Sequence, residues 1–225
     1  MSTDAVATEI SRIENVPLRV SVADIIRQAI INGSMRPGTP VVEMVLAEQL
    51  NVSRAPVREA IQILEADGLI ESEPYKGKRV KPLTIKGVEE LYSLREQFEA
   101  FAIRRVIERQ ADVSELHTHS DAMFAAAERG DLAALNVADE AFHRALIRLA
   151  DHSLMLSLWD NLYLRIRQIM ALRNSANRDL RAVARNHPPI IAAIEGRDTT
   201  LAVSLISAHT RSASQIAPEE LGITP

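Results

Sequence analysis

The chain lacks three features that often decide the class of a protein. Its 225 residues include no cysteine, which excludes disulfides and thiolate metal sites. No apolar run approaches the roughly 20 residues of a membrane-spanning helix, and the first residues carry acids where a secretion signal is basic. Basic residues are not in excess, since 26 Lys and Arg face 30 Asp and Glu. We therefore expect a cytoplasmic protein without a membrane partner that does not bind nucleic acid indiscriminately.

The first third of the chain has the pattern of a winged helix-turn-helix domain. After a tail over residues 1–16, apolar periodicity and turn residues predict a helix ending at Asn32-Gly33, a turn over 35–40, and helices over 43–50 and 53–67. Two short strands are expected next, over 69–72 and 78–81. A hairpin directly after a helix-turn-helix predicts a DNA-binding domain over residues 17–81.

The rest of the chain has only helical patterns. Residues 82–84 are predicted to be a linker, with Thr84 as the cap of the next helix. Six helices are expected in the region 85–225, at about 85–109, 114–129, 131–150, 153–174, 178–195 and 198–215. The predicted fold is therefore mainly α, with an N-terminal winged helix and a C-terminal antiparallel bundle of about six helices.

The third helix has separate apolar and basic faces. Arg54 and Arg58 lie one turn apart and project away from the stripe that contains Val57 and Ile61. Because arginine can donate two hydrogen bonds to guanine, both are candidate base or phosphate contacts, and Ser53 is a candidate phosphate contact. The alternative is that the arginines only form a solvated helix face.

Four polar residues occupy core-facing positions where Leu or Ile would be expected. They are Asp139, His143, His187 and His209, and each shares a helix face with apolar residues. Burying such groups without a partner is costly, so they are usually paired or bound to a metal. Three imidazoles and a carboxylate suit a divalent transition metal, with zinc as our first expectation and nickel, iron or manganese as alternatives. The competing interpretation is a set of core histidines satisfied by carbonyls or water.

The string from Leu46 to Ala60, LAEQLNVSRAPVREA, closely resembles the winged helix of the GntR family of transcription regulators. The resemblance covers residues 19–81. It implies a regulator that binds an operator in double-stranded DNA as a homodimer, with the wing in the minor groove. The implied DNA contacts are Ser53, Arg54, Ala55, Arg58, Lys76, Gly77 and Lys78. The chain departs from some members at Met44, where they carry an arginine.

The C-terminal half resembles the FCD-type (FadR/VanR-like) sensor domain of the same family. The landmarks are Leu91-Tyr92-x-Leu94-Arg95-x-x-x-Glu99, Asp139-x-x-Phe142-His143, Asn186-His187 and His209. The resemblance implies that Asp139 and the three histidines bind the metal and that a small carboxylate effector binds nearby, facing Arg95. Arg95 could instead form a surface ion pair with Glu99. The chain departs from the family at Pro188-Pro189, which predicts a helix break beside His187.

We therefore expect a ligand-responsive DNA-binding regulator rather than an enzyme. A repressor is expected over an activator, because repressors are the commoner kind in this family. One alternative is a metal-dependent hydrolase on the bundle, which would need a free general base near the metal, and only Glu99 is a candidate. A second is a sensor in which the metal ion is the signal. In a third, the ion is purely structural.

Overall fold

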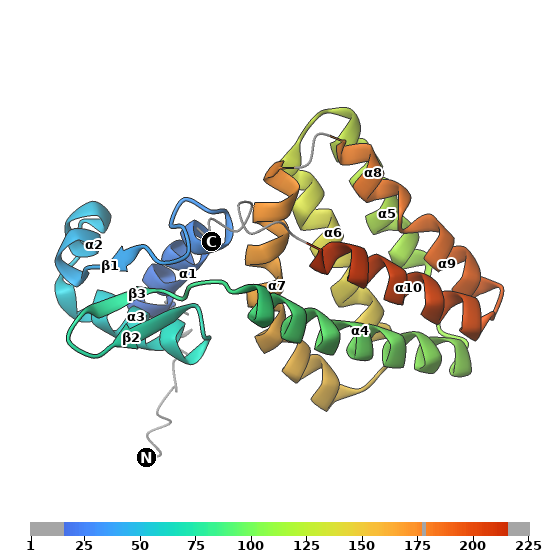
Figure 1. Ribbon diagram of the computed structural model, residues 1–225, viewed down its shortest axis with the longest axis horizontal. Helices are drawn as coiled ribbons and strands as arrows, with labels where there is room; N and C mark the ends of the chain where they lie inside the picture. The colour runs from blue at the N-terminus through green and yellow to red at the C-terminus, as the bar shows by residue number, and fades with distance from the viewer. Residues whose placement is uncertain (1–15, 177–178, 216–225) are drawn as a thin grey trace, which may run out of the picture.

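The computed structural model describes residues 16–176 and 179–215. It has a small head made of the first helices and strands, and a larger helical bundle (Figure 1). Apart from Val16, the predicted tail lies outside the described residues. Among the described residues, no helix is long and apolar enough to span a membrane.

The head is a winged helix-turn-helix. Its helices are α1 (Leu18–Ile31), α2 (Glu43–Leu50) and α3 (Arg54–Ala66), and its strands are β1 (Pro40–Val41), β2 (Ile70–Glu73) and β3 (Gly77–Val80). The strands form an antiparallel sheet in the order β1-β3-β2. The turn expected over 35–40 was wrong at its end, because Pro40 and Val41 pair with Arg79 and Lys78. A two-residue strand has no periodicity of its own and exists only through this pairing.

The core of the head follows the helical spacing of α3. Val57, Ala60, Ile61 and Leu64 have no exposed surface and pack with α1 and the sheet. Ser53 occupies the N-cap position in an extended conformation, but its side chain makes no capping hydrogen bond. Its hydroxyl thus stays exposed at the start of α3.

The predicted cap after the linker is present, since the Thr84 hydroxyl accepts a hydrogen bond from Gly87 N at 3.0 Å. The helices that follow are α4 (Ile85–Glu108), α5 (Ser114–Glu128), α6 (Leu132–Leu149), α7 (Ser153–Ala176), α8 (Leu180–Arg185), α9 (Pro188–Glu195) and α10 (Thr199–Ser214). The mainly helical fold class is confirmed.

The helix expected over 178–195 is two helices, so the described part of the bundle has one helix more than the expected six. Pro188 has no N–H to continue the hydrogen bonding of α8, and it begins α9 at a position where that loss is harmless. His187 is thereby left at the N-cap of α9. The helix break places this side chain in the bundle interior, where it is fully buried.

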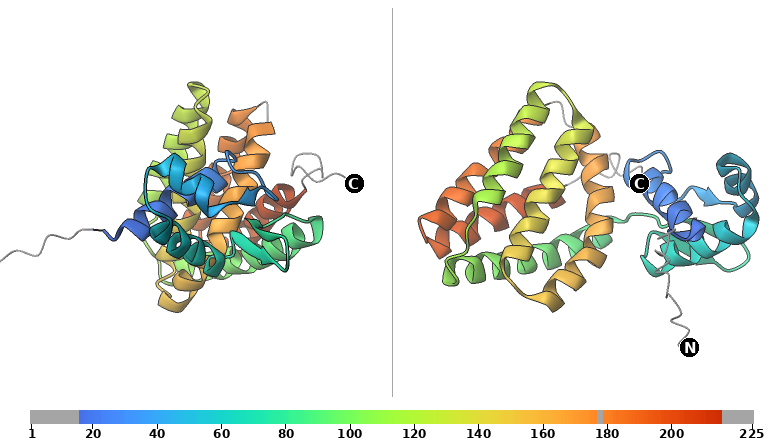
Figure 2. Two further views of the ribbon diagram at one scale, coloured as in Figure 1. Left: turned by 90° about the vertical axis from the view of Figure 1, so that its left-hand side faces the viewer. Right: turned by 180° about the vertical axis from the view of Figure 1, so that it is seen from behind.

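The helices of the bundle surround one core. α10 lies along α4, α5 packs against α6, and α1 of the head contacts α7 (Figures 1 and 2). Phe142 and Trp159 are among the fully buried side chains of this core. The predicted polar site lies inside it, between α4, α6, α9 and α10.

Candidate functional site

The structure brings the four predicted metal-binding residues together. Asp139 and His143 lie one turn apart on α6, while His187 is the N-cap of α9 and His209 lies on α10. Candidate ligand nitrogens of the three histidines all lie within 4.8 Å of one another. Asp139 Oδ1 is 3.1 Å from His187 Nε2 and 3.8 Å from His143 Nε2. His209 is half-buried and the other three are buried.

These donors fit a divalent cation. Both carboxylate oxygens of Asp139 and Nε2 of His187 are buried and have no hydrogen-bond partner within the described part of the chain. The other ring nitrogen of His187, Nδ1, lies 3.1 Å from the Val183 carbonyl oxygen and can donate to it. That hydrogen bond leaves the Nε2 lone pair directed at Asp139, the arrangement typical of a metal-binding histidine. An orphaned carboxylate beside free imidazole nitrogens is electrostatically suited to a cation.

His143 is held by a buried ion pair. The Arg95 guanidinium donates through Nε to Glu99 Oε1 at 2.7 Å, and Glu99 Oε2 lies 3.2 Å from His143 Nδ1. Arg95 Nη2 lies 2.8 Å from His143 Nε2. The surface ion pair considered for Arg95 is therefore wrong, because Arg95 and Glu99 are 1% and 0% exposed. The sequence suggested only an i, i+4 pair and did not show that this face of α4 is buried.

Burial sets the charge states of this site. It lowers the pKa of His143 and lowers that of His209 well below the ordinary value, so both rings are neutral near pH 7. Neutral imidazole is the form that coordinates metals. Burial alone would raise the pKa of Glu99, but the charges and hydrogen bonds of Arg95 and His143 together outweigh this and hold the pKa at about 2. Glu99 is thus an anion with Arg95 as its counter-ion.

Three further side chains surround Arg95 and were not predicted as site residues. Met170 Sδ lies 3.7 Å from Arg95 Nη1 and 3.8 Å from the Tyr163 hydroxyl. The Arg95 guanidinium also lies 5.3 Å from the centre of the Tyr92 ring. Met and Tyr on helical stripes look like ordinary core residues, so no sequence signal distinguished them.

The predicted DNA-reading residues lie on an exposed edge of the head. Arg54 and Arg58 project from α3, and both face the carboxylate of Glu43 at the start of α2, at 3.4 and 3.3 Å. Ser53 and Ala55 are exposed beside them. Glu43 thus faces both guanidinium groups, which the i, i+4 spacing already places on one side of α3.

The wing is the hairpin of β2 and β3. Lys76 at its tip is exposed and pairs with Glu73 at 2.7 Å, whereas Lys78 is partly buried and pairs with Glu65 at 2.5 Å. Gly77 has a φ of +89°, which glycine adopts readily.

One exposed residue of the wing was not predicted. Tyr75 is fully exposed and has a φ of +66°, a conformation that a bulky residue rarely adopts. An exposed aromatic ring in a strained turn indicates a functional position. In the sequence, the position of Tyr75 between Pro74 and Lys76, in the segment that joins the two expected strands, was the signal that could have identified it.

A winged helix-turn-helix joined to a helical bundle with a buried polar site defines a two-domain transcription regulator. Residues 18–80 match the family described as bacterial regulatory proteins, gntR family, and residues 90–212 match the FCD domain. The chain belongs to the GntR family and carries an FCD domain.

Similar proteins agree with this assignment. The chain is 33% identical over 199 residues to a probable D-xylose utilization operon transcriptional repressor of Paenarthrobacter nicotinovorans, covering 88% of each chain. It is 31% identical to a gluconate operon transcriptional repressor of Bacillus licheniformis, covering 81% of this chain and 77% of that one. A crystal structure described as a GntR regulator from Rhodococcus sp. RHA1 matches 93% of this chain and 100% of its own, with a TM-score of 0.75 and 26% identity. The protein is thus a transcription regulator and not an enzyme.

Proposed function

We propose that this protein is a homodimeric repressor that binds a palindromic operator and senses a small organic acid at a metal-containing pocket in its bundle. In this proposal, residues 17–81 form the DNA-binding domain, residues 82–84 form the linker, and residues 85–225 form the effector-binding and dimerisation domain. The observation that carries the proposal is the buried, unpartnered carboxylate of Asp139 facing His187 and His143.

Asp139, His143, His187 and His209 would hold the metal. A set of three imidazoles and one carboxylate favours zinc, with nickel, iron or manganese as alternatives. When bound, the ion supplies a positive, Lewis-acidic centre to which a carboxylate can coordinate. Arg95 pairs with Glu99 through Nε, and its Nη2, which lies 2.8 Å from His143 Nε2, would be the group that donates to a carboxylate bound at the ion.

The effector class follows from this charge and from the similar proteins. Two of them are named for the operons of D-xylose and gluconate, a sugar and a sugar acid. A sugar acid would combine the carboxylate that the metal and Arg95 favour with hydroxyl groups. We therefore expect the effector among small hydroxy acids, and we expect operator affinity to change when it binds.

The head would read the operator through Arg54 and Arg58 on α3. Ser53 and Ala55 at the start of this helix would lie against the DNA backbone, and the wing would reach the minor groove through Lys76, Gly77 and Lys78. The i, i+4 spacing supports this assignment because it places the two guanidinium groups together at the exposed edge, where both face Glu43.

The dimer would form through an exposed apolar stripe across α4 and α7. The Phe101 ring lies 5.7 Å from the ring of His152, just before α7, and the buried contact between Phe98 and Trp159 joins the two helices at 6.3 Å. The exposed members of the stripe are Leu94, Phe101, Leu154 and Leu158. A second copy of the chain is the occupant expected, because a regulator that reads a palindrome presents the same surface from both subunits.

A hydrolase on this bundle is not supported. Glu99 Oε1 accepts from Arg95, and the charges and hydrogen bonds around the carboxylate hold its pKa at about 2, so Glu99 is a weak base near pH 7.

The proposal is tested by thermal melting with a panel of small carboxylates, run with bound metal and again after chelation. A ligand that binds only the folded protein raises the melting temperature by mass action. One acid whose shift disappears on chelation would support a metal-assisted effector pocket. If chelation lowers the midpoint but no acid shifts it, the sensing proposal fails. Operator binding against metal concentration then separates an ion that is the signal from one that is structural.

A further inference from the structure

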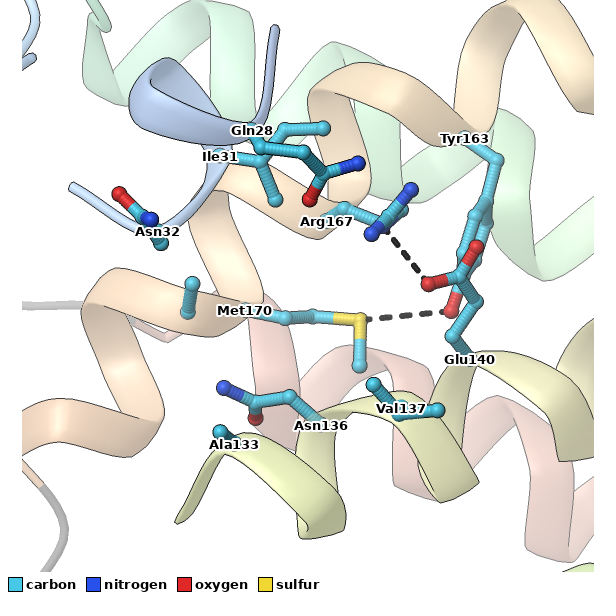
Figure 3. Close-up of a pocket in the computed structure, with 11 residues that line it drawn as sticks. Gln28, Ile31, Asn32, Ala133, Asn136, Val137, Glu140, Tyr163, Arg167 and Met170 are labelled. Carbon is cyan, nitrogen blue, oxygen red and sulfur yellow. Dashed lines mark hydrogen bonds and ion pairs between the residues drawn. The ribbon is translucent and has the colours of Figure 1, made fainter. Parts of the chain in front are cut away.

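A cavity lies where the head meets the bundle. Its volume is about 260 Å³, and its walls come from α1 on one side and from α6 and α7 on the other (Figure 3). None of the four proposed metal ligands lines it. The cavity is thus separate from the metal site and lies between the part that reads DNA and the part that senses the effector.

The charges in this cavity cancel. Within the described part of the chain, the charged residues that line it are Arg167 of α7 and Glu140 of α6, and they pair at 2.7 Å (Figure 3). An anion would have to compete with Glu140 for the Arg167 guanidinium, and a cation would have to compete with Arg167 for the Glu140 carboxylate. The lining therefore favours an uncharged ligand.

The remaining polar groups are the hydroxyl of Tyr163, which lies 3.8 Å from Met170 Sδ, and three amides. Gln28 comes from α1, Asn32 directly follows the last residue of α1, and Asn136 comes from α6. Asn136 Oδ1 already accepts a hydrogen bond from Asn174 at 2.7 Å, and Asn32 Oδ1 accepts one from the Ser34 N–H, so the amino groups of both remain for a ligand. Each amide side chain has both donors and an acceptor, which matches hydroxyl groups that also donate and accept. Ile31, Val137 and Met170 provide apolar surface between these amides.

The size of the cavity limits the ligand. This volume equals the volume that roughly nine water molecules occupy in liquid water. Because bonded atoms pack more closely than separate waters, roughly a dozen non-hydrogen atoms fit. This is the size of a six-carbon sugar or alditol.

The cavity is placed to affect both domains. Met170 and Tyr163 line it, and the same Met170 sulfur contacts Arg95 beside the metal site. On the other side, α1 packs against α3, which carries Arg54 and Arg58. A ligand that contacts both walls would hold the head in one orientation relative to the bundle.

We propose that this junction cavity is a second small-molecule site, which binds an uncharged polyhydroxylated compound of about six carbons. The binding is independent of the metal site. Its effect on operator affinity rests on the proposed function, so binding and DNA affinity are measured separately.

The test uses four six-carbon compounds that differ mainly in charge. D-sorbitol, D-glucose, D-gluconate and D-glucosamine are titrated calorimetrically into the full chain and into a His187→Ala variant, in which the metal site is disrupted. We expect saturable binding of sorbitol or glucose to both proteins, and weaker or no binding of the two charged compounds to His187→Ala. If neither neutral compound binds, or if gluconate binds His187→Ala as tightly as they do, the proposal is overturned. If gluconate binds only the wild-type chain, it binds at the metal site, and the junction proposal is judged on the neutral compounds alone.

Two variants locate the binding. Ala133→Trp places a bulky ring at an exposed position in the cavity wall and should abolish binding, whereas Ala125→Trp, on the exposed face of α5, should leave it unchanged. Gln28→Leu keeps the shape of the side chain and should weaken binding about two- to tenfold, as expected for one lost hydrogen bond. Equal binding to Ala133→Trp and Ala125→Trp would place the ligand elsewhere and refute the assignment.

Discussion

Glu99 and His143 face each other in the bundle interior, with Glu99 Oε2 3.2 Å from His143 Nδ1. A carboxylate on this side of the ring favours the tautomer with a proton on Nδ1. His143 Nε2 then carries the lone pair, which accepts a hydrogen bond from Arg95 Nη2 at 2.8 Å, while His209 Nε2 and Asp139 Oδ1 lie 3.3 and 3.8 Å away. A metal ion bound to Nε2 would take the place of that hydrogen bond. Carboxylate, imidazole and metal in this order is a common arrangement, in which the outer carboxylate fixes the ring and raises its basicity.

Glu99→Gln should weaken metal binding without removing a ligand. Loss of such an outer carboxylate costs about 10–100-fold in metal affinity. The same change leaves Arg95 without a buried counter-ion and should lower the melting temperature. Zinc affinity is measured by competition with a chromogenic chelator, below the melting midpoint. Glu90→Gln is the matched control on the exposed side of α4 and should behave as wild type. A Glu99→Gln variant with wild-type zinc affinity would mean that Glu99 does not position His143.

His143→Ala should abolish stoichiometric metal binding, because it removes one of three imidazoles and frees Arg95 and Glu99 from their shared partner. Metal content after purification is measured by elemental analysis, together with the change in melting temperature on chelation. That change should disappear in the variant. His117→Ala, at an exposed histidine that pairs with Glu195, is the control and should keep its metal. Wild-type metal content in His143→Ala would exclude this residue as a ligand.

The elements of the fold were largely predictable because each depends on local periodicity. The spacing of Val57, Ile61 and Leu64 defines the buried face of α3, and Thr84 caps α4 as expected. The strand β1 was missed because two residues carry no pattern and depend on pairing with β3. The break at Pro188 was indicated by the sequence, but its effect, which places His187 at the start of a new helix, needed the structure.

The site was predictable only in part. Polar residues on apolar stripes identified Asp139 and the three histidines, because burial without a partner is costly. The role of Arg95 was less clear, because Arg-x-x-x-Glu on a helix looks the same whether its face is exposed or buried. The packing of α6, α7 and α10 on α4 decides this and depends on contacts distant in sequence. The cavity between α1 and α7 is likewise a tertiary feature.

Arg58→Ala should weaken specific operator binding by about 1–3 kcal/mol per half-site, the range for losing a good base contact. The fold should stay intact because the Arg58 side chain is exposed and pairs with Glu43 at the surface. Fluorescence anisotropy with operator and with unrelated DNA is the measurement. Arg104→Ala, at an exposed position of α4, is the control. If Arg58→Ala binds the operator as tightly as wild type, Arg58 does not contact the operator and its assignment as a DNA-reading residue of α3 is rejected.

Tyr75→Asn should weaken operator binding while the melting temperature stays near that of wild type. Asparagine tolerates the positive φ at this position, so the substitution removes the exposed ring without changing the turn. Tyr75 would contact the DNA beside Lys76 at the tip of the wing. DNA affinity and thermal stability are measured in parallel, with Tyr75→Phe as a control that keeps the ring. If Tyr75→Asn binds operator like wild type, the ring has no role in DNA binding.

Leu158→Glu should convert the proposed dimer into a monomer. Leu158 is exposed on α7, next to Leu154 on the same helix face, and a carboxylate there would be buried without a partner in a two-fold interface. Light scattering coupled to size-exclusion chromatography should change from twice the chain mass of 24.9 kDa to that mass. Leu201→Glu, at an exposed leucine of α10 outside the stripe, should remain dimeric.

Operator binding gives a second readout for this interface. A monomer has to bind each half-site separately, so Leu158→Glu should lose affinity for the full palindrome and keep wild-type affinity for an isolated half-site. If Leu158→Glu remains dimeric while Leu201→Glu dissociates, the subunit interface lies at α10 and not at the stripe on α4 and α7. If both variants remain dimeric, the stripe is not the subunit contact and its exposed leucines serve another purpose.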